Sequence, residues 1–457
     1  MFKRKKYDYD LIIIGSGAGG SVGAHHARSL GKRVAIFEKA EVGGECPNWA
    51  CVPTKAILHS AEVYQAALDA KTFGINNEKV EPDFQKIKKW KDLVVSRTGS
   101  AHGKETLEKD GIDLILEKAR FVNPNEVEAG GKVYSAANFI IATGSTVSVP
   151  PIPGLSETGF ITFREAVDYD ENPPKSMFIL GGGPIGCEFA QIFATFGIKV
   201  TIADNLDRLL AKEDTEVSDL VKGLFENKGI NVLTNVNVHK VEKKGGKKIV
   251  HLQNNGSHSS IEVDEILVAT GKRPVLDFEP EKAGIFTEGG RIKVNQYLQT
   301  SQKHIYAAGD IVGPYLFTHT GYYQSFIAAS NIFSRRKVKP DYQVVPRCVF
   351  ISPEVASVGA TEESAKDAKI KIKKGIIPIS ILGRANTSNE FDGFVKIITD
   401  KNRVIIGGSI IAPHAGEMIH EIALAIKLKV KASVLADMLH AYPTFSEGIK
   451  IACATIE

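Results

Sequence analysis

Residues 9–20 read Tyr9-Asp-Leu-Ile-Ile-Ile-Gly-Ser-Gly-Ala-Gly-Gly20, an apolar run that ends in a cluster of glycines. Such a run is typical of a buried strand, and the alanine-rich stretch that follows, up to Leu30, is typical of a helix. A second apolar run, Val34 to Phe37, ends at the acid Glu38. We therefore predict a strand, a glycine turn, a helix and a second strand, the βαβ unit of dinucleotide-binding folds.

The same order of features returns in the middle of the chain. Met177-Phe-Ile-Leu precedes Gly181-Gly-Gly-Pro-Ile-Gly186, a helix is expected through Phe196, and a strand from Lys199 to Ala203 ends at Asp204. The acid follows the first glycine by 23 positions in both copies (38 − 15 and 204 − 181). Because a tandem match is much more specific than a single one, the chain is predicted to hold two similar dinucleotide folds.

The glycines of both copies match the requirements of a pyrophosphate site. Backbone N–H groups at a helix N-terminus bind a pyrophosphate well, provided that no side chain blocks its approach. The first glycine of each copy allows the tight turn, the second lets the phosphate come near, and the third lets helix and strand pack. In chain order these residues are Gly15, Gly17 and Gly20 in the first copy, and Gly181, Gly183 and Gly186 in the second.

The acids at the ends of the second strands, Glu38 and Asp204, are expected to accept hydrogen bonds from a ribose diol. A carboxylate suits a free 2′-hydroxyl and repels a 2′-phosphate, so Asp204 favours NADH over NADPH. Arg208, four residues later, would weaken this preference if it faced the ribose, but we interpret it as a solvated loop arginine.

Two further segments, Phe139-Ile-Ile-Ala-Thr143-Gly144 and Ile266-Leu-Val-Ala-Thr-Gly271, are each a strand ending in a glycine turn and would each close one nucleotide fold. Pro150–Gly154 has the composition of a linker, and His304-Ile-Tyr-Ala-Ala-Gly-Asp310 is a strand that we expect to return to the first fold. From about Tyr342 onward, alternating runs beside helical stretches suggest an α+β domain. The predicted domains are 1–149 with 272–341, then 150–271, then 342–457.

The bulk composition narrows the class of protein. The 457 residues exceed what a single core usually supports, and the net charge of +4 is too small to call for nucleic acid or an acidic membrane as partner. The apolar run after the basic N-terminus is too short for a signal peptide or a membrane span, so the cytoplasm is the expected location. Five cysteines are too few and too scattered for a disulfide scaffold.

One close pair of cysteines asks for a redox or metal explanation. In Gly43-Gly-Glu-Cys46-Pro-Asn-Trp-Ala-Cys51-Val-Pro-Thr-Lys55, four residues separate the thiols and a helix is predicted from Thr54 to Ala67. A helix N-terminus beside Cys51 would stabilise a thiolate. Zinc would need two more ligands, and no second cysteine pair or cysteine–histidine cluster is present, so no metal site is predicted. The other cysteines, read as buried and inert, are Cys187, Cys348 and Cys453.

Over essentially its whole length the chain resembles the class I pyridine nucleotide–disulfide oxidoreductases, which include dihydrolipoyl dehydrogenase, glutathione reductase and mercuric reductase. The resemblance implies FAD in the first nucleotide fold, NAD(H) in the second, and a C-terminal dimerisation domain that begins near Arg347 and builds a homodimer. It also implies the fold class: two Rossmann-like α/β domains plus an α+β domain.

The resemblance assigns roles to individual residues. It implies that Cys51 lies near the flavin, that Cys46 exchanges with substrate, and that Lys55 and Glu188 pair beside the flavin N5 edge. The acid Asp310 would bind the ribityl chain. Thr143, Gly144 and Gly271 complete the expected cofactor contacts.

The C-terminal segment His440-Ala-Tyr442-Pro-Thr-Phe-Ser-Glu447 matches the family's His-x-His-Pro-Thr-x-x-Glu, except that tyrosine replaces the second histidine. In family members that act on dithiols, that histidine comes from the other subunit and carries the proton. A tyrosine hydroxyl ionises only around pH 10 and is a poor base at neutral pH. His440, two positions earlier, is interpreted as structural.

The favoured function is an NADH-dependent enzyme that passes electrons through FAD to the Cys46–Cys51 disulfide and on to a small disulfide, dithiol or other acceptor, as in dihydrolipoyl dehydrogenase. A metal-ion reductase is the first alternative, because mercuric reductases also carry tyrosine at this place. Against it, only Cys453 stands near the C-terminus, where those enzymes add a cysteine pair. The cysteine motif also resembles a ketone-cleaving reductase/carboxylase, against which Lys55 counts. An FAD-binding redox sensor with little turnover is the remaining alternative.

Overall fold

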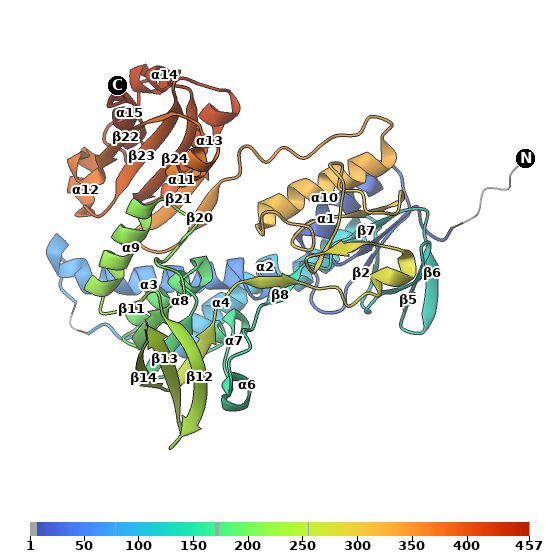
Figure 1. Cartoon of the computed structure of the whole chain (residues 1–457), viewed down its shortest axis with the longest axis horizontal. Helices are drawn as coiled ribbons and strands as arrows, with labels where there is room; N and C mark the ends of the chain where they lie inside the picture. The colour runs from blue at the N-terminus through green and yellow to red at the C-terminus, as the bar shows by residue number, and fades with distance from the viewer. Residues whose placement is uncertain (1–6, 78, 170–172, 255, 457) are drawn as a thin grey trace, which may run out of the picture. The chain divides into compact units, whose positions relative to one another are not determined.

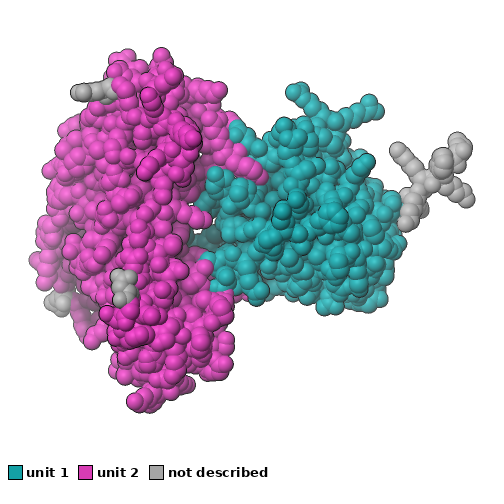
Figure 2. All heavy atoms as spheres, in the orientation of Figure 1, with its two compact units in different colours: residues 1–56, 85–148, 271–341 teal, residues 57–84, 149–270, 342–457 magenta. Residues whose placement is uncertain are grey.

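A computed structural model describes residues 7–77, 79–169, 173–254 and 256–456. These residues form two compact units, coloured separately in Figure 2. The first unit comprises the described residues up to Ala56 together with Gln85–Ser148 and Gly271–Asp341. The second comprises Ile57–Phe84, Val149–Thr270 and the chain from Tyr342 onward.

The first unit is built on a five-stranded parallel sheet of order β19-β7-β1-β2-β3. Its central strand β1 packs alternate residues into two cores, Ile12 and Ile14 on one face and Leu11 and Ile13 on the other. A strand buried on both faces has to be apolar throughout, which explains the unbroken apolar run. The helices α1 and α10 lie side by side against this sheet (Figure 1). The strands and helices are β1 (Leu11–Ile14), β2 (Val34–Phe37), β3 (Asp113–Ile115), β7 (Phe139–Ile141), β19 (Ile305–Ala307), α1 (Ala18–Ser29) and α10 (Thr318–Phe333).

The second unit contains a four-stranded parallel sheet of order β11-β10-β9-β15, with a three-stranded antiparallel sheet inserted before its last strand. The strand predicted from Lys199 to Ala203 is β10, with the same bounds. The elements are β9 (Ser176–Leu180), β10, β11 (Asn231–Leu233), β15 (Glu265–Val268), α8 (Pro184–Thr195), α9 (Thr215–Asn227), and the inserted β12 (Asn237–Lys244), β13 (Lys247–Asn254) and β14 (Ser257–Val263).

The same unit holds the C-terminal α+β region, an antiparallel sheet of order β20-β21-β24-β23-β22 with helices packed on it (Figure 1). Its core lies between the sheet and the helices α13 and α15. The strands are β20 (Arg347–Val349), β21 (Glu354–Gly359), β22 (Ile372–Pro378), β23 (Phe394–Asp400) and β24 (Ile405–Ala412); the helices are α11 (Glu362–Asp367), α12 (Gly383–Ser388), α13 (Ala415–Lys427), α14 (Ala432–Asp437) and α15 (Glu447–Ala454). The predicted fold class, two parallel-sheet nucleotide folds plus an α+β domain, is confirmed.

The remaining elements connect these sheets. They are the helices α2 (Glu45–Asn48), α3 (Cys51–Asp69), α4 (Phe84–Thr98), α5 (Ser100–Lys109), α6 (Leu155–Thr158) and α7 (Phe163–Ala166), the strands β4 (Arg120–Asn123), β5 (Glu126–Ala129), β6 (Lys132–Ser135), β8 (Ser145–Val147), β16 (Lys272–Pro274), β17 (Thr287–Glu288) and β18 (Arg291–Ile292), and three 3₁₀ turns at 70–73, 280–283 and 379–381.

The glycine turns of the two nucleotide folds have the same geometry. Gly15 and Gly181 have φ angles of +104° and +114°, in the region that favours glycine. A Cβ atom on Gly20 would collide with the carbonyl oxygen of Gly15, and one on Gly186 would collide with that of Gly181. Glycine at these positions therefore lets each helix begin directly against its strand.

Candidate redox site

The two thiols of the cysteine pair lie at the starts of consecutive helices in the first unit. Cys46 is in the short helix α2, and Cys51 opens α3, three residues before the predicted helix start at Thr54. Pro53 stands in the first turn of α3, where its missing N–H costs no helical hydrogen bond, so it does not delay the helix. Both cysteines are partly buried free thiols. The expectation that Cys51 lies at a helix N-terminus agrees with this position.

The proton and the negative charge of the pair are unevenly shared. Cys46 donates a hydrogen bond to the sulfur of Cys51, and this bond is the largest cause that lowers the pKa of Cys51 to about 6. The hydroxyl of Thr318 and the ammonium groups of Lys55 and Lys272 act in the same direction, against the effect of burial. The pKa of Cys46 is raised, first by the hydrogen bond to Cys51 and then by burial. The reduced pair is therefore a Cys46 thiol beside a Cys51 thiolate.

Two side chains near the thiols come from distant parts of the chain. The Oγ1 atom of Thr318, at the start of α10, lies 3.6 Å from the Sγ atom of Cys51. Lys272, at the start of β16, has its Nζ atom 2.6 Å from Oε2 of Glu45, the residue that precedes Cys46. The sequence pattern identified neither Thr318 nor this ion pair. The only local signals were the position of Glu45 next to a cysteine and of Lys272 next to the glycine turn at Gly271.

The acid of each nucleotide fold accepts hydrogen bonds from the glycine turn of the same fold. The Oε2 atom of Glu38 accepts hydrogen bonds from the backbone N–H of Ser16, at 3.0 Å, and from the hydroxyl of Ser16, at 2.7 Å. The Oδ2 atom of Asp204 accepts one from the backbone N–H of Gly182 at 2.6 Å. Ser16 and Gly182 each follow the first glycine of their turn, so the two folds repeat the same contact.

The glycine turns leave room where a pyrophosphate would approach. A Cβ atom on Gly183 would have no other atom within 4 Å, and one on Gly17 would lie 3.7 Å from its nearest neighbour. Both glycines are N-caps, of α8 and α1. Space beside a helix N-terminus fits a dinucleotide phosphate. The residues present therefore fit FAD in the first fold and a nicotinamide dinucleotide in the second.

The other predicted cofactor residues of the first unit lie where adjacent parallel strands end. Gly15 follows β1, Thr143 and Gly144 follow β7, and Asp310 follows β19, in a sheet where these three strands are neighbours. The carboxyl ends of such strands are the usual ligand edge of a doubly wound sheet. The Oδ2 atom of Asp310 accepts a hydrogen bond from the hydroxyl of Ser145 at 2.5 Å. Gly271, with a φ of +98°, follows β15 along the chain.

The remaining predicted catalytic residues belong to the second unit. Glu188 in α8 is 5% exposed, and its Oε1 atom accepts a hydrogen bond from the backbone N–H of Phe350 at 3.1 Å. Tyr442 is 78% exposed, and Glu447 begins α15, where its Oε2 atom accepts a hydrogen bond from the backbone N–H of Thr444 at 3.2 Å. The structure thus brings Cys46, Cys51 and Lys55 together within the first unit. The pairing of Lys55 with Glu188 stays a prediction.

The C-terminal segment holds His440 and Tyr442 in different surroundings. The Nε2 atom of His440 lies 3.1 Å from Oε1 of Glu421, and the histidine side chain is 6% exposed. The ring of Tyr442 lies against Gly383, where a Cβ atom would come within 2.9 Å of the tyrosine hydroxyl. His440 is therefore held by its own domain, in agreement with its interpretation as structural, while Tyr442 is presented at the surface.

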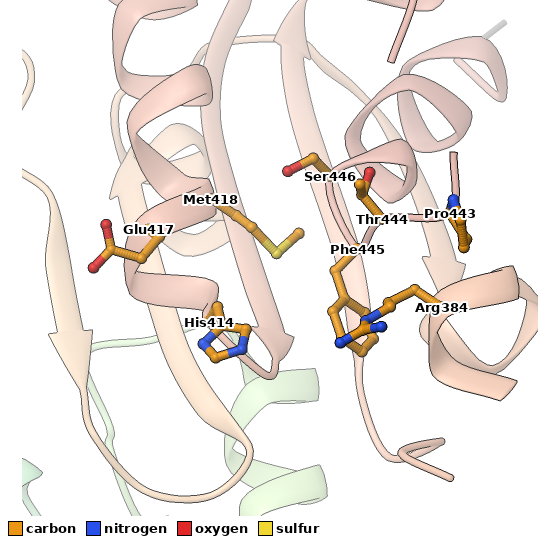
Figure 3. A pocket seen from close by; sticks show the side chains of 8 residues that line it. All are labelled: Arg384, His414, Glu417, Met418, Pro443, Thr444, Phe445 and Ser446. Atoms are coloured by element: carbon orange, nitrogen blue, oxygen red, sulfur yellow. The ribbon is translucent and has the colours of Figure 1, made fainter. Parts of the chain in front are cut away.

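A pocket of about 420 Å³ lies beside this segment (Figure 3). The side chain of Met418 points into it from α13, and Arg384 lies next to Phe445 on the opposite wall. The full lining is Arg384, His414, Glu417, Met418, Pro443, Thr444, Phe445 and Ser446. The residues directly after Tyr442 thus form one wall of a space with both charged and apolar groups.

One sequence interpretation is wrong. Arg208 is not a solvated loop side chain, because it is 22% exposed and its guanidinium group pairs with Asp207 and Glu363. Its NH2 group also donates to the carbonyl oxygen of Ala211. Its guanidinium group is therefore already engaged by two carboxylates, which compete with a 2′-phosphate for its N–H donors.

The described residues hold neither a group of metal ligands nor a helix suited to crossing a membrane. In the described part of the chain, no three His, Cys, Asp or Glu side chains are grouped so that they could hold a metal ion. Among these same residues, none of the helices has both the length and the apolar character required for a membrane crossing.

Two dinucleotide folds combined with a polarised thiol pair define a flavin-dependent redox enzyme of the disulfide-reducing class. The family model described as "Pyridine nucleotide-disulphide oxidoreductase" matches residues 9–331, and the one for its dimerisation domain matches residues 345–453. The chain belongs to this family of FAD flavoproteins with a redox-active disulfide.

Similar proteins come from two functional groups. A dihydrolipoyl dehydrogenase of Thermus scotoductus is 37% identical, with 96% of each chain covered. A mercuric reductase of Staphylococcus aureus is 33% identical, covering 98% of this chain and 83% of the relative. Among solved structures, the HOCl-induced flavoprotein disulfide reductase RclA from Escherichia coli has a TM-score of 0.89 at 29% identity, covering 98% of this chain and 100% of that one.

Proposed function

We propose that the chain is an NADH-dependent flavoprotein disulfide reductase of the dihydrolipoyl dehydrogenase type, acting as a homodimer. The observation that supports this most directly is the setting of the thiol pair, in which Cys51 begins α3 beside the hydroxyl of Thr318, so that the negative charge is favoured on Cys51 and the proton on Cys46. An inert pair of buried cysteines has no reason to be polarised in this way, whereas an exchange centre requires a thiolate. We propose three domains with the boundaries expected from the sequence, 1–149 with 272–341, then 150–271, then 342–457.

FAD, when bound, supplies the two-electron chemistry that links the nicotinamide to the cysteine disulfide. The chain's own residues position it. The turn at Gly15, Gly17 and Gly20 binds the pyrophosphate, Glu38 the ribose, and Asp310 the ribityl chain. The second turn and Asp204 bind NADH, with the carboxylate facing a free 2′-hydroxyl.

The thiols then carry the electrons to the acceptor. For a disulfide acceptor, the Cys46 sulfur attacks one sulfur and forms a mixed disulfide, while the other acceptor sulfur leaves with the Cys46 proton as a thiol. The Cys51 thiolate attacks Cys46 in turn, which forms the Cys46–Cys51 disulfide and releases the second acceptor sulfur as a thiolate. Two electrons leave the cysteine pair for the acceptor, and NADH replaces them in the next cycle.

The acceptor is the part of the function that Tyr442 leaves open. A metal-ion reductase is the alternative, favoured by the 33% identity to a mercuric reductase over nearly the whole chain and by the likeness to RclA, which has been solved as a Cu(II) complex. Against it, Cys453 is 3% exposed and packed in the C-terminal core. A redox sensor with slow turnover is the third candidate.

The experiment is steady-state oxidation of NADH by the holoenzyme with lipoamide, glutathione disulfide, a quinone, Hg²⁺ and Cu²⁺. We expect lipoamide or another disulfide to support turnover. Fast turnover with only a metal ion would favour the alternative, and slow single turnover with every acceptor would favour the sensor.

A matched pair of variants tests the role of the cysteines. Cys46→Ser is expected to abolish acceptor turnover while leaving reduction of the bound flavin by NADH. Cys348→Ser, which changes a partly buried cysteine outside the pair, is expected to keep turnover. Unchanged turnover in Cys46→Ser would overturn the proposed function.

A further inference from the structure

A mostly buried ion pair stands directly beside the thiol pair. The Nζ atom of Lys272 lies 2.6 Å from Oε2 of Glu45, and the two side chains are 18% and 17% exposed. Glu45 is the first residue of α2 and the neighbour of Cys46. Lys272 opens β16, which pairs with β8 in the first unit. Two segments separated by 227 positions are thus joined at the cysteine loop.

Stability is a weak explanation for such a pair. Removing two charges from water costs several kcal/mol each, and their mutual attraction often no more than offsets this cost. A pair of apolar side chains would hold the same two segments together at lower cost. A pair of charges in this place therefore points to an electrostatic task.

The surroundings of Lys272 show where its charge acts. Burial lowers the pKa of Lys272, but Glu45, Asp310 and the Cys51 thiolate outweigh it and raise that pKa overall. In return, Lys272 lowers the pKa of Cys51. Lys55, one turn along α3 from Cys51, acts in the same direction. The thiolate consequently lies in the field of these ammonium groups, and the Lys272 group is held by Glu45.

We propose that Lys272 shares with Lys55 the stabilisation of the Cys51 thiolate, and that Glu45 is a positioning residue that keeps the Lys272 ammonium group at this place. The inference rests on the proposed function, because it concerns the same thiol pair. In this proposal, the groups that stabilise the negative charge on Cys51 all belong to the first unit, which also holds the cysteine loop. This fits a chain with Tyr442 at the place where family members that act on dithiols are expected to carry a proton-accepting histidine.

The test is the pH dependence of thiol alkylation in the reduced holoenzyme, followed for Cys51 by mass spectrometry. Lys272→Met is expected to raise the pKa of Cys51 by about one unit, which leaves roughly tenfold less thiolate at a pH below that pKa. Lys272→Arg keeps the charge and is expected to restore most of the shift. Lys39→Met is the matched control, since Lys39 pairs with Asp277 at 2.9 Å in the same unit.

The positioning role of Glu45 is tested by combining two substitutions in one variant. If Glu45 positions Lys272, the shift caused by Lys272→Met is smaller in a Glu45→Gln background than in the wild type. Equal shifts in both backgrounds would reject the positioning role. A Cys51 pKa that Lys272→Met leaves unchanged, or that Lys39→Met raises equally, would overturn the proposal. Alkylation needs no acceptor turnover, so this outcome is separate from the Cys46→Ser test of the proposed function.

Discussion

The hydroxyl of Thr318 lies 3.6 Å from the sulfur of Cys51, so the first residue of α10 serves as a hydrogen-bond partner of the thiolate. A hydrogen bond to the charged form of a group favours that form. Thr318→Val is expected to raise the pKa of Cys51 by about half a unit to one unit, whereas Thr318→Ser keeps the hydroxyl and the wild-type value. The alkylation profile of the reduced holoenzyme measures both. Equal profiles for Val and Ser would contradict the role of the hydroxyl.

Tyr442→His is expected to raise the rate of dihydrolipoamide oxidation. The side chain at this position is 78% exposed, whereas His440, two residues earlier, is bound to Glu421 within its own domain. A histidine titrates near neutral pH and would accept the thiol proton there. Rates measured between pH 6 and 9 check this, and His440→Asn is expected to bring no comparable gain. The absence of any increase at every pH would remove the argument about proton transfer.

Lys396→Met is expected to destabilise the second unit by about 3 kcal/mol. The lysine is 0% exposed, with its Nζ atom 3.1 Å from Asp214 and 3.0 Å from Glu216, and it also pairs with Glu362. Its loss leaves Asp214 buried without a counter-charge. Lys374→Met is the control, because Lys374 is 45% exposed and pairs with Glu216 and Glu362; its expected cost is below about 1 kcal/mol. Denaturant unfolding measures both, and equal losses would contradict the prediction.

The same cluster predicts a dependence of stability on pH. Burial acts to raise the pKa of Glu216, but hydrogen bonds and the charge of Lys396 outweigh it and lower the pKa to about 2. A carboxyl group whose pKa falls on folding stabilises the folded state above its unfolded pKa of about 4.3, and this contribution is lost as the pH falls toward 2. The difference in melting temperature between wild type and Glu216→Gln is therefore expected to shrink between about pH 5 and pH 2. A constant difference over that range would show that Glu216 gains nothing from Lys396.

The nucleotide folds could be predicted because their signals are local. The apolar strands, the glycine turns and the acids recur at a fixed spacing, and β10 has the predicted bounds. The helices of the cysteine loop were less accessible. Pro47 and Pro53 suggest an irregular loop, yet both stand in first turns, where no N–H is needed. The prediction therefore missed α2 and placed the start of α3 too late.

The residues of the candidate site also fall into those that the sequence predicts and those that it does not. Cys46 and Cys51 could be found because only four residues separate them. Thr318 and Lys272 could not, because they stand 267 and 227 positions from their partners and no local pattern links them to the cysteines. Arg208 was misread for a related reason, since its partner Glu363 comes from the C-terminal region. Electrostatic partners across a fold leave no periodic trace in the chain.

The burial of Lys396 in β23 among acids at the start of α9 has a consequence for any attempt to shorten the chain. Without the C-terminal sheet, Asp214 and Glu216 would lose their counter-ion, and Glu213 would lose Arg347. Three negative charges within four positions would then repel one another at the N-terminus of α9. We therefore expect that the second nucleotide fold is not a separable module, and that a gene fragment ending before Tyr342 encodes a product prone to misfolding and proteolysis.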